Sequence, residues 1–223
     1  MQFHTWEPAY EAILRDFGYD RDGDEAARDE LAALVSDFDV SRLDATGETV
    51  AVVGAAPALP DDLDAVADAD RVFAASTAAD VLRERGLAVD VHVTDLDKNP
   101  ETSRELAREG TPVAAHAHGD NRDLVAEWVP KLDGANVLGT TQARPVDGVR
   151  NFGGFTDGDR AAFLADAVGA ERLRFAGWDF DDAPDDAKRR KLRWAARLLT
   201  WLEDRRDERY PILDGHRDLD WLP

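Results

Sequence analysis

The stretch Val89-Asp-Val-His-Val-Thr-Asp-Leu-Asp97 has valine at every second position and ends in two aspartates one residue apart. This alternation is the period of a β-strand with one apolar face. At the carboxyl end of such a strand the chain leaves the sheet, and open α/β sheets bind their ligands there. Asp95 and Asp97 are therefore expected to project into one crevice, about 6–7 Å apart along an extended backbone.

Two carboxylates held that close repel each other unless a cation lies between them. Mg²⁺ prefers a few carboxylates together with phosphate oxygens of a substrate, which suits this short acidic turn. Lys98 follows directly and could neutralise a phosphate beside the metal. The alternative is a solvated loop in which Lys98 pairs with a neighbouring acid, and the spacing alone leaves both open.

Strands and helices alternate on both sides of this stretch, from Thr49 onward. The alternation predicts an α/β fold with a mainly parallel, Rossmann-like sheet and helices on both faces. The expected strands are 49–54, 71–75, the strand ending at 95, 111–116, 135–140 and 172–177. The expected helices between and after them are 78–85, 100–108, 121–129, 157–168 and 184–202.

The pattern divides the chain into three parts. Residues 1–46 show apolar side chains at helical spacing and predict an N-terminal helical appendage beside the main domain. Residues 47–210 form the expected α/β catalytic domain, and 211–223 form a C-terminal tail without a clear period.

The composition of the chain limits its possible partners and metal sites. The 223 residues carry a formal net charge of -20, which makes nucleic acid and anionic membranes unlikely partners on electrostatic grounds. The acids are dispersed and lysine is scarce, which suggests a cytosol of very high salt. Cysteine is absent, which excludes a thiolate metal site. No signal peptide or membrane span is evident, so we expect a cytoplasmic protein; whether it forms a homo-oligomer stays open.

Polar clusters follow the other predicted strands at the same edge. Gly54 begins a turn that runs through Pro57 to Leu59, where a phosphate could approach the backbone or the turn could simply be tight. Asp179 follows the last strand. The remaining candidates are His116, His118, Asp120 and Asn121 after the fourth strand, Thr140 and Gln142 at the fifth, and Phe155, Asp157, Asp159 and Arg160 beyond it.

Each of these residues also has a structural interpretation. Asp120 or Asn121 could cap a helix, the histidines could be hydrogen-bonded core residues, and Arg160 could pair with Asp157. Phe155 offers a flat surface against which a ring could stack. Their expected convergence on one edge of one sheet favours a functional site.

Three runs together resemble the archaeal 6-hydroxymethyl-7,8-dihydropterin diphosphokinase family (MptE-like), which is related to thiamine diphosphokinases. The runs are Thr94-Asp-Leu-Asp97, His116-Ala-His-Gly-Asp-Asn121 and Asn151-Phe-Gly-Gly-Phe-Thr-Asp-Gly-Asp-Arg160, and the likeness spans roughly residues 49–180. The resemblance implies a thiamine-diphosphokinase-like catalytic domain. It also implies transfer of diphosphate from ATP to the pterin hydroxyl, with Mg²⁺ required, AMP released and the product used for folate or methanopterin-type coenzymes.

The resemblance also implies roles for residues. Asp95 and Asp97 become Mg²⁺ ligands, and either these acids or His116 would serve as the weakly required base. The implied contacts to ATP or phosphate are Gly54, Pro57, Lys98, His118, Asp120, Asn121, Thr140 and Gln142. The implied contacts to substrate are Phe155, Asp157, Asp159, Arg160 and Asp179.

Two positions depart from the family pattern. Ser76-Thr77 stands where an Asp-Gly pair is usual, and Lys98 stands where the acidic turn tends to continue with glycine. The rival interpretations are a thiamine diphosphokinase, a sugar transferase using a nucleotide donor, and a nucleotide- or metal-binding module without catalysis.

Overall fold

The computed structural model describes residues 1–218 and 220–221 and confirms the predicted α/β class. All seven strands are parallel and lie in the order β6-β5-β4-β3-β2-β1-β7. The strands are β1 (Thr49–Val53), β2 (Arg71–Ala75), β3 (Val91–Thr94), β4 (Val113–Ala117), β5 (Val137–Thr141), β6 (Val149–Arg150) and β7 (Arg172–Ala176).

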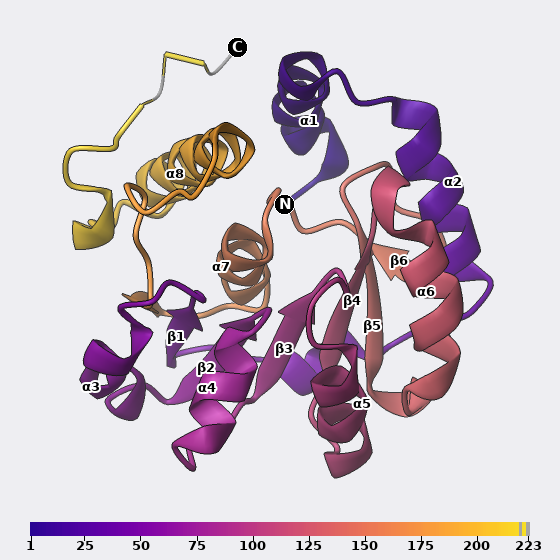
Figure 1. Cartoon of the computed structure of the whole chain (residues 1–223), viewed down its shortest axis with the longest axis horizontal. Coiled ribbons are helices and arrows are strands. Elements are labelled where there is room, and N and C mark those ends of the chain that lie inside the picture. Colours follow the sequence, from indigo (N-terminus) through magenta and orange to yellow (C-terminus); the bar gives the residue numbers. More distant parts are fainter. Residues whose placement is uncertain (219, 222–223) are drawn as a thin grey trace.

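Helices cover both faces of the sheet (Figure 1). On one face lie α1 (Phe3–Phe17), α7 (Asp157–Ala167) and α8 (Asp186–Arg206). On the other lie α2 (Arg21–Ala32), α3 (Leu63–Ala67), α4 (Ala78–Glu84), α5 (Pro100–Glu109) and α6 (Arg122–Trp128).

The alternation of side chains along each strand feeds two separate cores. In β1, Val50 and Val52 pack with α1, α7 and α8, whereas Ala51 and Val53 pack with the helices of the opposite face. This is the period of two expected of a strand that is covered on both sides.

The order of the strands creates a switch point between β1 and β7. From β1 the chain adds β2 to β6 in one direction, and it then returns to place β7 on the other side of β1. At such a point the connections leave in opposite directions, and open α/β sheets have a crevice there beyond the carboxyl ends of the strands.

The first two helices are part of the layers just described. Trp6, Tyr10 and Ile13 of α1 are buried in the core that they share with residues of α7 and α8. Ala27 and Leu31 of α2 are buried in the opposite core. The predicted boundary after residue 46 stays a prediction, as does the boundary after 210.

Several element limits differ from the sequence-based expectation. The predicted helical segment 1–46 contains two helices, which begin at Phe3 and Arg21, and α8 runs from Asp186 to Arg206 instead of 184–202. The short α3 and the two-residue β6 have no clear period and escaped prediction. In the predicted tail, Pro211–Leu213 is a short 3-10 helix, and residues 219, 222 and 223 lie outside the described part.

Candidate functional site

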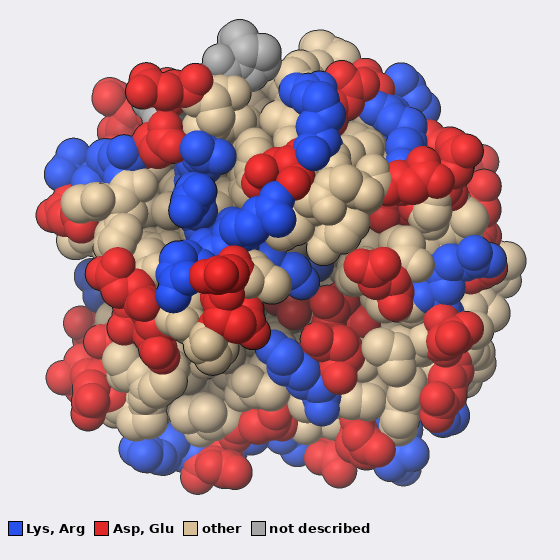
Figure 2. Space-filling view, turned by 45° about the horizontal axis from the view of Figure 1, so that its top comes forward, with Lys and Arg blue, Asp and Glu red and all other residues tan. Residues whose placement is uncertain are grey.

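A cavity of about 510 Å³ lies beyond the carboxyl ends of the strands. Loops that follow β1 to β5 and β7 contribute to its lining, as do the beginnings of α7 and α8 and the turn between α1 and α2. Figure 2 shows a hollow in the surface with acidic side chains at its floor and basic side chains beside it. The volume lies in the range typical of small-molecule sites.

The turn after β3 directs two carboxylates into this cavity. Leu96 has φ 67°, a left-handed conformation that is unfavourable for a branched side chain, and it is completely buried. The Thr94 hydroxyl accepts a hydrogen bond from the Leu96 N–H at 2.9 Å and holds the turn. Because Leu96 points into the core, Asp95 and Asp97 on either side of it both line the cavity.

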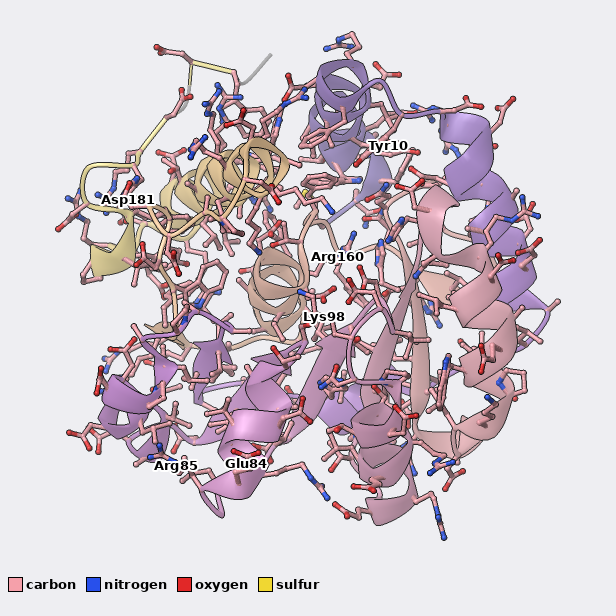
Figure 3. All side chains as sticks on the ribbon, viewed as in Figure 1. Tyr10, Glu84, Arg85, Lys98, Arg160 and Asp181 are labelled. Carbon is pink, nitrogen blue, oxygen red and sulfur yellow. The ribbon has the colours of Figure 1, made fainter. Side chains whose placement is uncertain are left out.

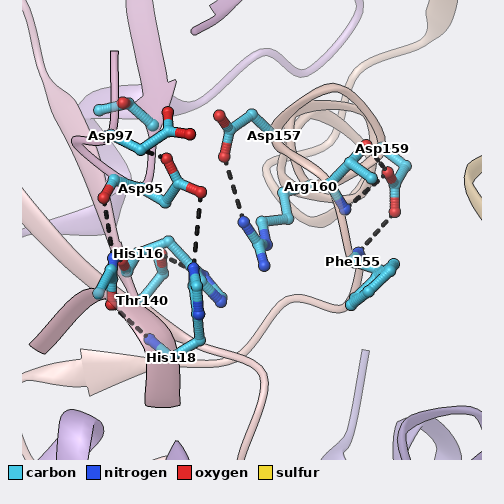
Figure 4. Close-up of polar contacts among 12 residues, drawn as sticks. Asp95, Asp97, His116, His118, Thr140, Phe155, Asp157, Asp159 and Arg160 are labelled. Atoms are coloured by element: carbon cyan, nitrogen blue, oxygen red, sulfur yellow. Dashed lines mark hydrogen bonds and ion pairs between the residues drawn. The ribbon is translucent and has the colours of Figure 1, made fainter. Parts of the chain in front are cut away.

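The carboxyl groups of Asp95 and Asp97, which lie next to each other in Figure 4, have opposite pKa shifts. Burial would raise the pKa of Asp95, but hydrogen bonds from His118 and Asp97 and the charge of Arg160 lower it well below its usual range. His118 Nε2 lies 3.5 Å from an Asp95 carboxylate oxygen. Burial, and then the hydrogen bond and charge of Asp95, raise the pKa of Asp97 to about 6. The pair therefore shares a proton readily, as crowded carboxylates do.

A third acid approaches from the beginning of α7. Burial and the charge of Asp95 raise the pKa of Asp157 to about 7, although Arg160 opposes this shift. Arg160 Nη1 donates to Asp157 at 3.1 Å, and its Nη2 donates to Gln142 Oε1 at 3.4 Å. The Nε of Arg160 is buried and has no partner among the described residues. Lys98 and Arg160 both lie near the strand ends in Figure 3.

A layer of polar residues lies behind the cavity wall. His116 and Thr140 are register partners on β4 and β5, and His116 Nδ1 lies 3.1 Å from the Thr140 hydroxyl. Burial and the charge of Arg160 hold the pKa of His116 well below its usual value, so its ring is neutral. Asn121 donates through Nδ2 to the carbonyls of Asp95 and His116, both at 2.8 Å. Asn121 thus joins the ends of β3 and β4.

Asp159 is also buried behind the wall. Its carboxylate accepts hydrogen bonds from the Phe155 N–H at 2.6 Å and the Thr156 N–H at 2.9 Å, and also from the Thr156 hydroxyl. This is a capping box that begins α7. Of the sequence-predicted site residues, His116, Asn121, Thr140 and Asp159 therefore do not line the cavity. Their direct contact with a ligand stays a prediction.

The remaining candidates all reach the cavity. Gly54 and Pro57 line it beside β1, and the structure gives Gly54 a packing reason as well. A Cβ on Gly54 would lie 2.6 Å from the Gly177 carbonyl oxygen, so only glycine fits this contact between the β1 and β7 loops. The other candidates that line the cavity are Asp95, Asp97, Lys98, His118, Asp120, Gln142, Phe155, Asp157, Arg160 and Asp179.

One wall of the cavity, formed by the turn between α1 and α2 and the first residues of α2, has no signal in the sequence. Asp24 accepts hydrogen bonds from the Tyr10 hydroxyl at 2.8 Å, Gln142 Nε2 at 2.7 Å and the Gly119 N–H at 2.8 Å. It thereby fixes the N-terminal helices to the ends of β4 and β5, and Tyr19 of the same turn lines the cavity. An acid at the start of a helix is normally read as a capping residue, so no local signal indicated this role.

Three more lining residues escaped prediction. Trp178 donates through Nε1 to the Val52 carbonyl at 3.0 Å and presents a ring beside Gly158. Lys188 and Lys191 extend from the first turns of α8. Trp178 directly precedes Asp179, and only the acid indicated a ligand site at the end of this strand. Lys188 and Lys191 lie in a helix rich in charged residues. Such a pattern indicates a face exposed to solvent, so it did not predict a contact with the cavity.

The carboxylates suit a divalent cation that is completed by a ligand. Within residues 1–218 and 220–221, no three His, Cys, Asp or Glu side chains are arranged to hold a metal ion by themselves. Mg²⁺ is usually held by one or two carboxylates, with water and substrate phosphates as the other ligands. The contact between the Asp95 and Asp97 carboxyl groups is the arrangement that such a cation relieves, so these residues fit it.

Ser76 lies in the same cavity, where the family pattern would place an acid. Its φ is 51°, its Oγ is buried without a partner among the described residues, and its backbone N–H donates to the Val93 carbonyl at 2.9 Å. A hydroxyl here gives a neutral ligand or donor in place of a third carboxylate near Asp95 and Asp97.

Comparison with known proteins indicates the family of this chain. A family model described as "6-hydroxymethylpterin diphosphokinase MptE-like" matches residues 26–185. Three archaeal relatives carry the name 6-hydroxymethyl-7,8-dihydropterin pyrophosphokinase.

The relatives are matched over nearly their whole length. The protein from Methanothermobacter thermautotrophicus is 38% identical, and the match covers 94% of this chain and 98% of the relative. The protein from Pyrococcus furiosus is 37% identical, and the match covers 92% of this chain and 95% of the relative. The protein from Methanocaldococcus jannaschii is 30% identical, and the match covers 92% of this chain and 97% of the relative. On the strength of these matches, this chain belongs to the MptE-like 6-hydroxymethylpterin diphosphokinase family.

Proposed function

We propose that the protein transfers diphosphate from ATP to 6-hydroxymethyl-7,8-dihydropterin in a Mg²⁺-dependent reaction, giving the pterin diphosphate and AMP. The names of the three relatives support the reaction class. The observation that carries the proposal is the turn at Leu96, which holds Asp95 and Asp97 together in a cavity that also contains basic and aromatic side chains. The product would enter the synthesis of a folate or methanopterin-type coenzyme.

In the proposed reaction the pterin hydroxyl oxygen forms a bond to the β-phosphorus of ATP. The bond between that phosphorus and the oxygen bridging it to the α-phosphate breaks, and AMP leaves with the bridging oxygen. Such a transfer depends mainly on positioning and on neutralising phosphate charge. Mg²⁺, bound by Asp95 and Asp97, would supply neutralising charge at the phosphates.

The residues around the acids orient them for this task. His118 contacts Asp95, and Asn121 binds the carbonyl of Asp95 from behind the wall. Arg160 holds one oxygen of Asp157, which leaves the other free to accept the hydroxyl proton as the new bond forms. Phe155 and Trp178 line the cavity with apolar rings against which a flat heterocycle can stack.

The decisive test is the formation of AMP. We expect the protein, with ATP and Mg²⁺ in concentrated salt, to form AMP when the hydroxymethyl dihydropterin is supplied and to form little with thiamine. AMP formed only with thiamine would identify a thiamine diphosphokinase, and no AMP with either alcohol would favour a binding module.

A variant locates the reaction in this cavity. Asp97→Asn should lower turnover at least about 100-fold, since it removes one of two charges that hold the cation. Glu84→Gln is the matched control, because Glu84 is exposed at the outer end of α4, away from the cavity (Figure 3). Near-normal turnover of Asp97→Asn would remove this residue from the proposed machinery.

A further inference from the structure

Lysine has an unusual distribution in this chain. Of its 27 basic residues only four are lysine, at positions 98, 131, 188 and 191. Lys131 pairs with Glu127 at 2.8 Å and lies over the ring of Trp128. The other three lysines all line the one cavity beyond the strand ends.

Two of these lysines come from the same face of one helix. Lys188 and Lys191 are three residues apart in the first turns of α8, so their side chains lie on one side of it. Lys98 comes from the turn after β3, directly following Asp97. Segments about 90 residues apart thus bring three ammonium groups to one cavity.

These lysines differ from the arginines around them. On α8, Arg189 pairs with Asp186 and Arg190 pairs with Asp16. Among the residues that the structure describes, no carboxylate lies within 4.0 Å of the ammonium group of Lys98, Lys188 or Lys191. In a chain with a net charge of -20, three cations without an ion-pair partner form a local excess of positive charge.

The three charges act on one another and on the acidic floor. Partial desolvation within the cavity and the charges of Lys98 and Lys191 lower the pKa of Lys188. Lys98 and Lys191 in turn oppose the upward shift of the Asp97 pKa. The cavity therefore has a negative floor and a positive wall, which suits a ligand that presents a cation to the floor and several anionic oxygens to the wall.

We propose that Lys188 and Lys191, together with Lys98, bind the phosphate chain of the nucleotide in the cavity that also holds Asp95 and Asp97. Naming the anion as a nucleotide rests on the proposed function, whereas the existence of a polyphosphate site does not. Ammonium groups suit this task because they are compact charges with rotatable donors on flexible stems. The amino end of α8 adds its partial positive charge beside them.

Lys188 and Lys191 lie outside the segment that the family model matches. The family model ends at residue 185, three residues before Lys188. In the fold, however, α8 packs against α7, whose first turn carries Asp157. The packing of α8 thus places the two lysines beside the strand-end loops although they are remote from them in sequence.

The test measures binding and needs no turnover. Wild type and the variants Lys188→Gln, Lys191→Gln and the double variant would be titrated with inorganic tripolyphosphate and with ATP, each with Mg²⁺ at constant ionic strength. We expect affinity for both ligands to fall about tenfold or more per lysine, as for a lost charged hydrogen bond. Lys131→Gln, which removes the same charge elsewhere, is the control and should bind as wild type.

The results separate this inference from the proposed function. Loss of tripolyphosphate binding in the double variant supports the polyphosphate site even if wild type forms no AMP with the pterin. Lys188→Arg/Lys191→Arg should recover most of the affinity if charge is what matters. Wild-type affinity in the double variant for both ligands, or no binding of either ligand by wild type, would overturn the inference. Both side chains are exposed, so the variants should fold normally.

Discussion

Individual buried polar residues connect this sheet to its helices, and His92 is one that is completely buried. It lies in the middle of β3, away from the cavity lining, with Nδ1 3.3 Å from the Ala74 carbonyl and Nε2 3.1 Å from the Ser103 hydroxyl. A carbonyl oxygen can only accept, so Nδ1 donates to Ala74, and in a neutral ring Nε2 is then the acceptor. Burial lowers the pKa of His92 to about 4, although Ala74 and the charge of Asp80 oppose the shift.

The buried ring makes stability depend on pH. The folded pKa of His92 is about 4 and the unfolded value is 6.5, so the unfolded chain takes up the proton first as pH falls. The neutral ring favours the folded state fully above pH 6.5, and this contribution is lost as pH falls through 6.5 toward 4. Between pH 7.5 and 5 we expect it to cost about 2 kcal/mol of unfolding free energy.

The measurement is urea unfolding of wild type and His92→Gln at pH 7.5 and pH 5 in the same concentrated salt. For each protein the loss of unfolding free energy between pH 7.5 and pH 5 is measured. Carboxylates that titrate in this range contribute equally to the loss in wild type and in the variant, so their contribution cancels when the two losses are compared. The variant should lose about 2 kcal/mol less than wild type. An equal loss in both proteins would mean that His92 is not what titrates.

At the scale of elements, the glycine pair before α7 places the helix and its arginine. Gly154 has φ +93°, and a Cβ there would lie 2.6 Å from the Cα of Arg160. The loop therefore passes directly over the first turn of α7, which lets Asp159 cap the helix and directs Arg160 toward Asp157. Gly110 at the end of α5 has nearly the same φ, +96°, but nothing within 4 Å of its Cβ position.

Alanine variants at these two glycines distinguish the cost of backbone strain from the cost of steric contact. Gly110→Ala should lower the unfolding free energy by about 1 kcal/mol, the cost of a left-handed alanine. Gly154→Ala carries the same strain and adds overpacking against Arg160, so it should cost at least about 2 kcal/mol more. Urea unfolding of both variants in concentrated salt gives the comparison. Equal losses would show that close packing at Gly154 adds nothing.

The elements also show what could be predicted from the sequence. Hydrophobic alternation located all the strands except β6, because a buried strand needs a run of apolar residues long enough to have a period. It also placed the polar clusters at one edge of the sheet, since the ends of parallel strands meet there. It could not place Asp24, Lys188 or Lys191, because only the packing of α2 on the sheet and of α8 on α7 brings them to the cavity.

The direction of individual side chains was harder to predict than their segment. Asp159 and Asn121 belong to the runs that indicated the site, but they bind backbone groups behind the wall. A short polar side chain at a helix start can serve a ligand or the backbone, and the sequence does not distinguish these roles. The turn at Leu96 was equally invisible, because a left-handed leucine has no sequence signature.

The whole molecule is dominated by its negative charge. Acidic side chains are spread over the face seen in Figure 2, with basic side chains interspersed, and the formal net charge is -20. Ion pairs such as Arg122–Glu30 and Arg83–Glu109 offset part of the repulsion, but exposed pairs contribute little each. Within the described residues, no helix is long and apolar enough to cross a membrane.

Repulsion among these charges should make folding depend on salt. The distance over which charges act falls from about 10 Å at 0.1 M salt to about 3 Å at 1 M, so concentrated salt removes most of the repulsion that unfolding would relieve. We therefore expect the Tm to rise by several degrees or more between 0.1 and 2 M KCl, as measured by circular dichroism. The proposed adaptation to a very salty cytosol predicts the same direction.

Two variants distinguish screening from a general effect of salt on burial. Glu84→Lys/Asp204→Lys places positive charge at two exposed acids near the carboxyl ends of α4 and α8, which also suits the helix dipoles. It should raise the Tm in dilute buffer and flatten the dependence of Tm on KCl. Glu84→Asp/Asp204→Glu keeps the charge and should follow wild type. If all three proteins gain equally from KCl, salt acts through burial of apolar surface and the negative charge is not what limits stability.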